Sequence, residues 1–128
     1  MSRRDQLYDA YYNNFKELLD NLSRIRINDS SLIVFKSSMY IYVQTYGVKE
    51  LVNTMNSFVS GYTNKILSKD ETFFLEELAN DFQDSSFVLN EINKIREIWV
   101  DSSTTKAHKD IIWKHFIIFA KLGKALHM

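Results

Sequence analysis

The sequence contains no proline and only three glycines, the two residues on which tight turns depend most. All-β folds need many such turns, so this scarcity favours helices over a sandwich or a barrel. Cysteine is also absent, which excludes disulfides, thiolate nucleophiles and cysteine ligands for metals. No apolar run approaches the roughly 18 residues of a transmembrane helix, so we expect no membrane association.

Net charge is lacking as well, because 16 basic residues balance 16 acidic ones. The chain therefore has no global field that would attract nucleic acid or anionic lipid. The charges are unevenly placed, however: acidic residues gather between Asp70 and Glu91, and lysines between Lys106 and Lys124. We expect these two segments to neutralise each other, within one molecule or between molecules.

The 128 residues suit one domain, and a 45% share of hydrophobic residues is typical of a chain that folds. No stretch rich in flexible residues divides the chain. The sequence therefore predicts a single all-α domain over residues 1–128, a bundle of five or six helices that ends in an antiparallel helical hairpin.

Residues 1–28 carry the most regular apolar pattern, with Ser2 and Asp5 as a capping start. Apolar side chains recur there at steps of three and four, and three more widen the stripe. The stripe consists of Tyr8, Tyr11, Phe15, Leu18, Leu22 and Ile25, with Leu7, Tyr12 and Leu19 beside it. It is too short for an autonomous coiled coil, which favours packing inside a bundle.

A second helix is expected from about residue 31 to residue 46. Its apolar residues fall on most sides of the helix, which predicts a central position in the bundle. Residues 39–43 also have high β propensity, so a strand is the alternative there, but the flanks lack hairpin signals. Gly47 is expected to end this helix before a third helix over residues 48–59.

The last two helices are expected on either side of a polar loop at residues 101–105. Their apolar stripes are Val88, Ile92, Ile95 and Trp99, then Ile112, Phe116, Phe119, Gly123 and Leu126. A short loop between two such helices favours the antiparallel hairpin. Trp99 and Trp113 are predicted to be buried near its turn.

Motifs that carry chemistry are absent, including glycine-rich phosphate loops and nucleophile elbows. His108 and His115 are seven residues apart, roughly 10 Å along a helix, and His127 has no acidic partner at helical spacing. We expect all three histidines to be solvated or capping. The acidic residues Glu77, Asp81 and Asp84 are expected to form a solvated face. The sequence thus predicts no catalytic residue, no cofactor and no metal site.

Three segments carry a resemblance to a known group of proteins. The first is the box Ser68-Lys69-Asp70-Glu71-Thr72-Phe73-Phe74-Leu75. The other two are the predicted helices over residues 92–99 and 111–116, which carry the pairs Ile98-Trp99 and Ile112-Trp113. Over residues 35–126 the chain resembles small helical proteins of nucleocytoplasmic large DNA viruses, in which a DE-x-FFL box precedes two helices with such Ile-Trp pairs. The group has no established activity. The resemblance implies a viral setting, in the host cytoplasm or the virion interior, without secretion.

The leading expectation is therefore a non-enzymatic interaction or structural protein of a large DNA virus that acts through helical surfaces. Its expected partners are another copy of itself or another viral protein. The first helix offers tyrosines and phenylalanine for such a contact, namely Tyr8, Tyr11, Tyr12 and Phe15, in a homodimer or in a partner's groove. The alternative is that this stripe packs within its own core.

A second expectation is a nucleic-acid-associated accessory protein that uses the basic last helix. The residues concerned are Lys106, Lys109, Lys114, Lys121 and Lys124. Binding of that kind usually brings a basic excess, which this chain lacks. The third hypothesis is a small enzyme whose active site is not revealed by any sequence motif.

Overall fold

The computed structural model describes residues 2–74 and 87–127, with side chains described for residues 2–74 and 94–127. All regular elements in these residues are helical, which confirms the predicted all-α bundle and the helix over residues 39–43. They are α1 (Arg3–Ile25), α2 (Ser30–Tyr46), α3 (Val48–Val59), the 3-10 turn η1 (Ser60–Tyr62), α4 (Thr63–Leu67), α6 (Phe87–Val100) and α7 (Lys106–Leu126). Among these helices, none is long and apolar enough to cross a membrane.

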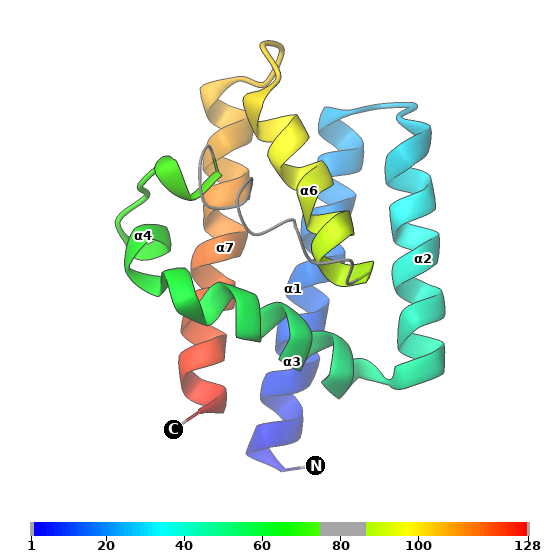
Figure 1. Cartoon of the computed structure of the whole chain (residues 1–128), viewed down its shortest axis with the longest axis vertical. Helices are drawn as coiled ribbons and strands as arrows, with labels where there is room; N and C mark the ends of the chain where they lie inside the picture. Colours follow the sequence, from blue (N-terminus) through cyan, green and yellow to red (C-terminus); the bar gives the residue numbers. More distant parts are fainter. Residues whose placement is uncertain (1, 75–86, 128) are drawn as a thin grey trace.

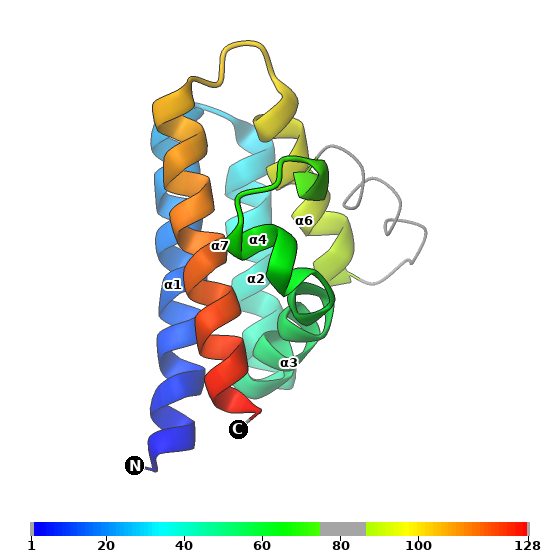
Figure 2. The same cartoon turned by 90° about the vertical axis from the view of Figure 1, so that its left-hand side faces the viewer.

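The two longest helices, α1 and α7, run antiparallel and side by side, and their interface is the most extensive in the bundle (Figures 1 and 2). Helix α2 returns alongside α1, and α3 then crosses the bundle and packs against α1, α2 and α7. The two termini lie at the same end of the molecule (Figure 1). There the Arg4 guanidinium donates a hydrogen bond of 2.8 Å to the carbonyl of Leu126.

Local chemistry sets the helix ends largely as predicted. The Ser2 hydroxyl accepts from the backbone N–H of Asp5 at 3.1 Å, and the Asp29 carboxylate caps α2. Gly47 ends α2 with a φ of 91°, a region that favours glycine. Thr105 caps α7 in a reciprocal box with His108, so the expected capping roles of the polar loop and of this histidine are confirmed.

Local hydrogen bonds also shape the box at residues 68–75. The Asp70 carboxylate accepts from the N–H and the hydroxyl of Thr72 at 3.0 and 2.7 Å. Ser68 donates its hydroxyl to the carbonyl of Lys65 at 3.2 Å. The acidic residues at 77, 81 and 84 and the apolar residue at 78 lie outside the described residues.

The two tryptophans lie where they were predicted, near the turn between α6 and α7. Trp99 is 1% exposed and Trp113 is 4% exposed, and their rings meet edge to face with centroids 5.3 Å apart. However, α7 packs mainly on α1, whereas α6 leans across the molecule and contacts α3 (Figure 1). The chain reverses at residues 101–105, but the hairpin itself is not confirmed.

An aromatic cluster surrounds Phe74 where α6 and α7 meet the box. Its ring stacks on Trp99 with centroids 4.1 Å apart and meets the edges of Trp113 and Phe116 at 4.9 and 5.2 Å. Phe73 packs beside it at 4.9 Å. Both phenylalanines of the box are fully buried, so their role in the described structure is to fill the core.

A polar cluster is buried between α1 and α7. The Asn14 amide donates to the carbonyl of His115 at 2.9 Å, which leaves its side-chain oxygen to accept from His115 Nδ1 at 2.8 Å. Nε2 of the same ring lies 2.8 Å from the amide nitrogen of Asn21, whose oxygen accepts from Arg24 at 3.0 Å. These partners favour the neutral imidazole with its proton on Nδ1. The expectation that all histidines are solvated or capping is therefore wrong for His115, which is 2% exposed.

We expect the free energy of unfolding to decrease as the pH falls below 6.5. Burial, and secondarily the charge of Lys114, hold the pKa of His115 below its usual 6.5 in the folded chain, despite an opposing effect of Glu17. Between 6.5 and that lower pKa the unfolded chain binds the proton and the folded chain does not, so stability is lost at up to about 1.4 kcal/mol per pH unit. Urea unfolding at several pH values measures this slope. His115→Gln removes the titrating group, and an equal slope in that variant would contradict the prediction.

We expect Trp99→Ala to lower the free energy of unfolding by about 3–5 kcal/mol, because it leaves a large cavity beside Phe74. The indole N–H is buried without a hydrogen-bond partner in the structure, so Trp99→Phe loses no polar contact and serves as the matched control. Urea unfolding should show a clearly smaller loss for phenylalanine than for alanine. Equal stability of Trp99→Ala and the wild type would make this residue a surface contact.

Candidate interaction surface

Helix α2 lies at the edge of the bundle, which corrects the predicted central position (Figure 1). Its buried residues are Leu32, Phe35 and Met39, which pack toward α1 and α3. The central place beside α1 belongs to α7 instead. The apolar residues on the other side of α2 therefore stay exposed.

The exposed side of α2 forms one continuous surface, which we call the outer face. Its members are spaced three and four residues apart, so they project from one side of the helix. They are Ile33, Val34, Ser37, Tyr40, Ile41 and Gln44. The four large apolar members are 63%, 59%, 61% and 62% exposed, respectively. Together they present an apolar area on the order of 500 Å², which is within the range of the largest apolar patches on typical monomers, and such patches are often functional.

The outer face carries no charge. Lys36 is the single charged residue of α2, and its ammonium pairs with Asp20 of α1 at 2.9 Å, at the border of this face beside Tyr40. Solvent-exposed helices usually present charged side chains on the side opposite the core. The missing charges therefore set α2 apart from a normal surface helix.

A shallow hollow of about 570 Å³ adjoins the outer face near the end of α2. It is lined by Ser38, Ile41, Tyr42, Thr45, Tyr46 and Glu50. The rings of Tyr42 and Tyr46 pack there in a tilted arrangement with centroids 4.9 Å apart. Tyr46 is 64% exposed at this end of α2, and Ile27 is 76% exposed just before the other end. Apolar surface thus extends to both ends of the helix.

The aromatic stripe predicted for protein contact lies elsewhere. Tyr8, Tyr11 and Phe15 are only 5%, 0% and 2% exposed. The rings of Tyr11 and Phe15 pack against Phe119 of α7 at 4.8 and 5.8 Å, and the Tyr8 hydroxyl donates to Asn53 of α3 at 3.0 Å. The prediction that these three residues meet a second molecule is therefore wrong, because α3 and α7 cover them.

Tyr12, the fourth predicted contact residue, is half-buried between α1 and α2. The Lys16 ammonium lies over its ring at 4.6 Å, and Tyr40 of the outer face lines the same small hollow. Burial, and secondarily the neighbouring Tyr40, raises the pKa of Tyr12. Tyr12 therefore lies at the edge of the outer face, where a partner bound to α2 would reach it.

The five α7 lysines proposed for nucleic-acid binding do not form one site. Lys109 is half-buried, with its ammonium 5.1 Å from the ring centre of Trp99 and 4.0 Å from Glu71. That ion pair is one contact of the expected kind between the acidic and basic segments. The other four are exposed and spread along a helix roughly 30 Å long: Lys106, Lys114, Lys121 and Lys124.

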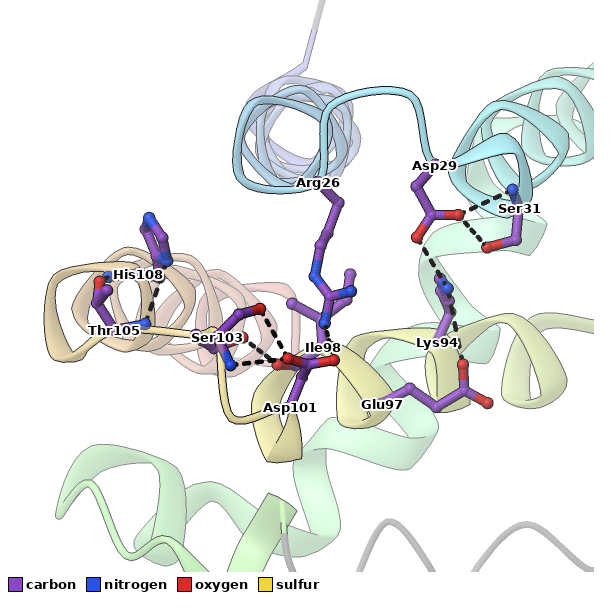
Figure 3. A network of polar contacts seen from close by, with 11 residues as sticks. Arg26, Asp29, Ser31, Lys94, Glu97, Ile98, Asp101, Ser103, Thr105 and His108 are labelled. Carbon is purple, nitrogen blue, oxygen red and sulfur yellow. Dashed lines mark hydrogen bonds and ion pairs between the residues drawn. The ribbon is translucent and has the colours of Figure 1, made fainter.

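A network of ion pairs joins the loops at one end of the bundle (Figure 3). Arg26 pairs with Asp101 at 2.8 Å, and Asp29 pairs with Lys94 at 3.1 Å. Hydrogen bonds from Ser103, then the guanidinium of Arg26, lower the pKa of Asp101 to about 2. Hydrogen bonds from Ser31 and Lys94 likewise lower the pKa of Asp29 to about 2. Each carboxylate has its cation, so the network ties the α1–α2 loop to α6 and to the loop before α7.

Comparison with known proteins adds no relative. No protein-family model, curated protein or solved structure matches the chain. Within residues 2–74 and 94–127, no group of three His, Asp or Glu side chains could hold a metal ion. In the part of the chain that the structure describes, four of the eight exposed large hydrophobic side chains lie on the outer face of α2.

The sequence contained a signal for this surface. One charged residue in the 17 of α2 is unusual for a helix at the edge of a bundle. Ile33, Val34 and Ile41 fall off the main stripe of the helix, and from sequence alone this pattern predicts burial on all sides. The same pattern is equally typical of a helix with one side packed internally and the other packed against a partner.

We expect Ile33→Lys and Ile41→Lys each to change the free energy of unfolding by less than about 0.5 kcal/mol, because both side chains are largely exposed in the folded chain. Phe35→Ala, on the buried side of the same helix, should instead lower it by about 3–5 kcal/mol. Urea unfolding of the three variants measures this contrast. A loss above about 2 kcal/mol for either lysine variant would place the outer face in the core of the folded chain.

Proposed function

We propose that this chain is a non-enzymatic protein-interaction or structural protein, and that the outer face of α2 is its contact surface. The observation that carries this proposal is the exposure of Ile33, Val34, Tyr40 and Ile41 side by side on a face whose own members are all uncharged. The largest exposed apolar patch of a monomer is often functional, and a patch of this size supports a binding role.

The apolar area of the outer face is large enough to contribute substantially to the free energy of binding. Burying about 500 Å² of apolar surface contributes roughly 12 kcal/mol before the costs of association and side-chain ordering are subtracted. Because those costs offset much of the free energy of burial, we expect a reversible interaction. A helix that presents one apolar side suits a helical partner or a partner's groove.

The viral setting forms part of this proposal. Its support is the motif resemblance: the Ser68–Leu75 box and the two Ile-Trp pairs, Ile98-Trp99 and Ile112-Trp113. In that setting the protein acts in the host cytoplasm or inside the particle, on another copy of itself or on another viral protein.

Proximity labelling in cells that produce the protein tests the proposed surface. The variant is the double change Ile33→Lys and Ile41→Lys, and the matched control is Lys114→Glu with Lys121→Glu on exposed positions of α7. At equal protein level, we expect the α2 variant to lose the proteins labelled by the wild type and the α7 variant to keep them.

An unchanged set of labelled proteins for the α2 variant would contradict the proposal. If the α7 variant alone lost its associated molecules, and these included nucleic acid, the lysines of α7 would carry the function instead. Urea unfolding of the double α2 variant, done as for the single variants above, checks that it retains the stability of the wild type.

A further inference from the structure

We propose that the outer face of α2 binds a second copy of the same chain, with the two α2 helices antiparallel and a two-fold axis passing beside Ser37. This inference rests on the proposed function, because it names the partner of the same surface. It follows from the order of residues on the face, from its charge, from the ends of the helix and from the exposed area.

The outer face has nearly the same character in both directions from Ser37. Ile33 and Ile41 lie four residues to either side, and Val34 and Tyr40 lie three residues to either side. In a two-fold antiparallel contact, each residue meets the one at the mirrored position of the other copy. Ile33 then packs beside the second copy's Ile41, and Val34 beside its Tyr40, so every large apolar residue of the face meets another.

Ser37 suits the crossing point of the two helices. The distance between packed helices depends on the side chains at their contact, and a small residue permits a close approach. Two serines on the axis would let the flanking isoleucines reach the opposite helix. The hydroxyls themselves can bond to each other or to a nearby backbone carbonyl, so no polar group is left without a partner.

Charge favours a second copy and an antiparallel orientation. The outer face is uncharged and the whole chain has zero formal net charge, so two copies do not repel each other. The Asp29 carboxylate caps the N-terminal end of α2, whereas no basic residue lies in its last turn. The negative end of the helix dipole is therefore uncompensated by a side chain, and an antiparallel pair brings it beside the N-terminal end of the other helix.

Two exposed apolar residues at the ends of α2, Ile27 and Tyr46, support the antiparallel orientation. Ile27 precedes the start of α2, and Tyr46 stands at its end beside the shallow hollow. An antiparallel pair brings the start of one α2 to the end of the other. Ile27 of one copy then lies near Tyr46 of the other, whereas a parallel pair would leave these residues at opposite ends.

The exposed area sets the strength to expect. About 500 Å² from each copy gives roughly 1,000 Å² in total, at the lower limit for a specific interface. Such a dimer should be reversible at micromolar concentrations. Sedimentation velocity of the wild type between low and high micromolar concentration should show a monomer that converts to a dimer, and Ile41→Lys should remain monomeric.

The absence of native cysteine permits a direct test of the axis, because any disulfide then reports only the cysteines introduced. Ser37→Cys places two thiols beside the axis, close enough to be bridged. Ser57→Cys, an exposed position on α3, is the matched control for random collision. Under mild oxidation at high micromolar concentration, we expect the Ser37→Cys dimer to form about tenfold faster or more, because neighbouring thiols have millimolar effective concentrations.

A mixture of Ile33→Cys and Ile41→Cys, one of them labelled with nitrogen-15, tests the orientation. An antiparallel pair places position 33 against position 41, so mass spectrometry should find mainly mixed dimers. A parallel pair would instead favour dimers of each variant with itself, and that result would overturn the proposed geometry.

A wild type that stays monomeric at high micromolar concentration, with Ser37→Cys no faster than Ser57→Cys, would overturn the second copy as the partner. The proximity-labelling result is independent of that outcome. Loss of labelling by the α2 variant together with a monomeric wild type would keep the proposed function and assign the face to a different protein. Unchanged labelling would remove the function itself.

Discussion

The packing of the first helix against the last one is the contact on which the rest of this structure depends. Rings of Tyr11 and Phe15 meet Phe119, and the side chain of Asn14 bonds both the ring and the backbone of His115. These partners lie about a hundred residues apart in the sequence, 101 in the case of Asn14 and His115. The contact therefore forms only when the intervening helices let the chain return, and such non-local contacts are slow to form.

This terminal pair decides what the other helices can cover. Because α7 occupies one side of α1, the apolar stripe of α1 has no surface left for a partner. Helix α3 crosses both and closes the core, and Gly123 of α7 permits this approach, since a Cβ there would overlap the side chain of Asn56. Helix α2 remains with only one side packed, and its other apolar side becomes the surface that most needs an explanation.

Most polar groups in the core and at the loop end of the bundle have partners. Buried polar groups of the α1–α7 interface are largely paired, and the ionic groups at the loop end pair across Arg26 and Asp101 and across Asp29 and Lys94. Such pairs hold loops in place and leave the carboxylates with satisfied partners.

Sequence by itself determined the features that depend on neighbours along the chain. Ser2 and Thr105 cap the starts of α1 and α7 and Gly47 caps the end of α2, and these positions were predictable because the capping bonds and the positive φ involve only nearby residues. The spacing of apolar residues likewise identified the buried sides of α1 and α7 and the burial of Trp99 and Trp113. Only the tertiary structure decided which helices meet. The pattern of α2 is apolar on most sides and so has no preferred direction, and its exposed side follows from α7 having taken the place beside α1. His115 was missed for the same reason, since its burial depends on Asn14 and Asn21 of a helix that spacing along α7 cannot reveal.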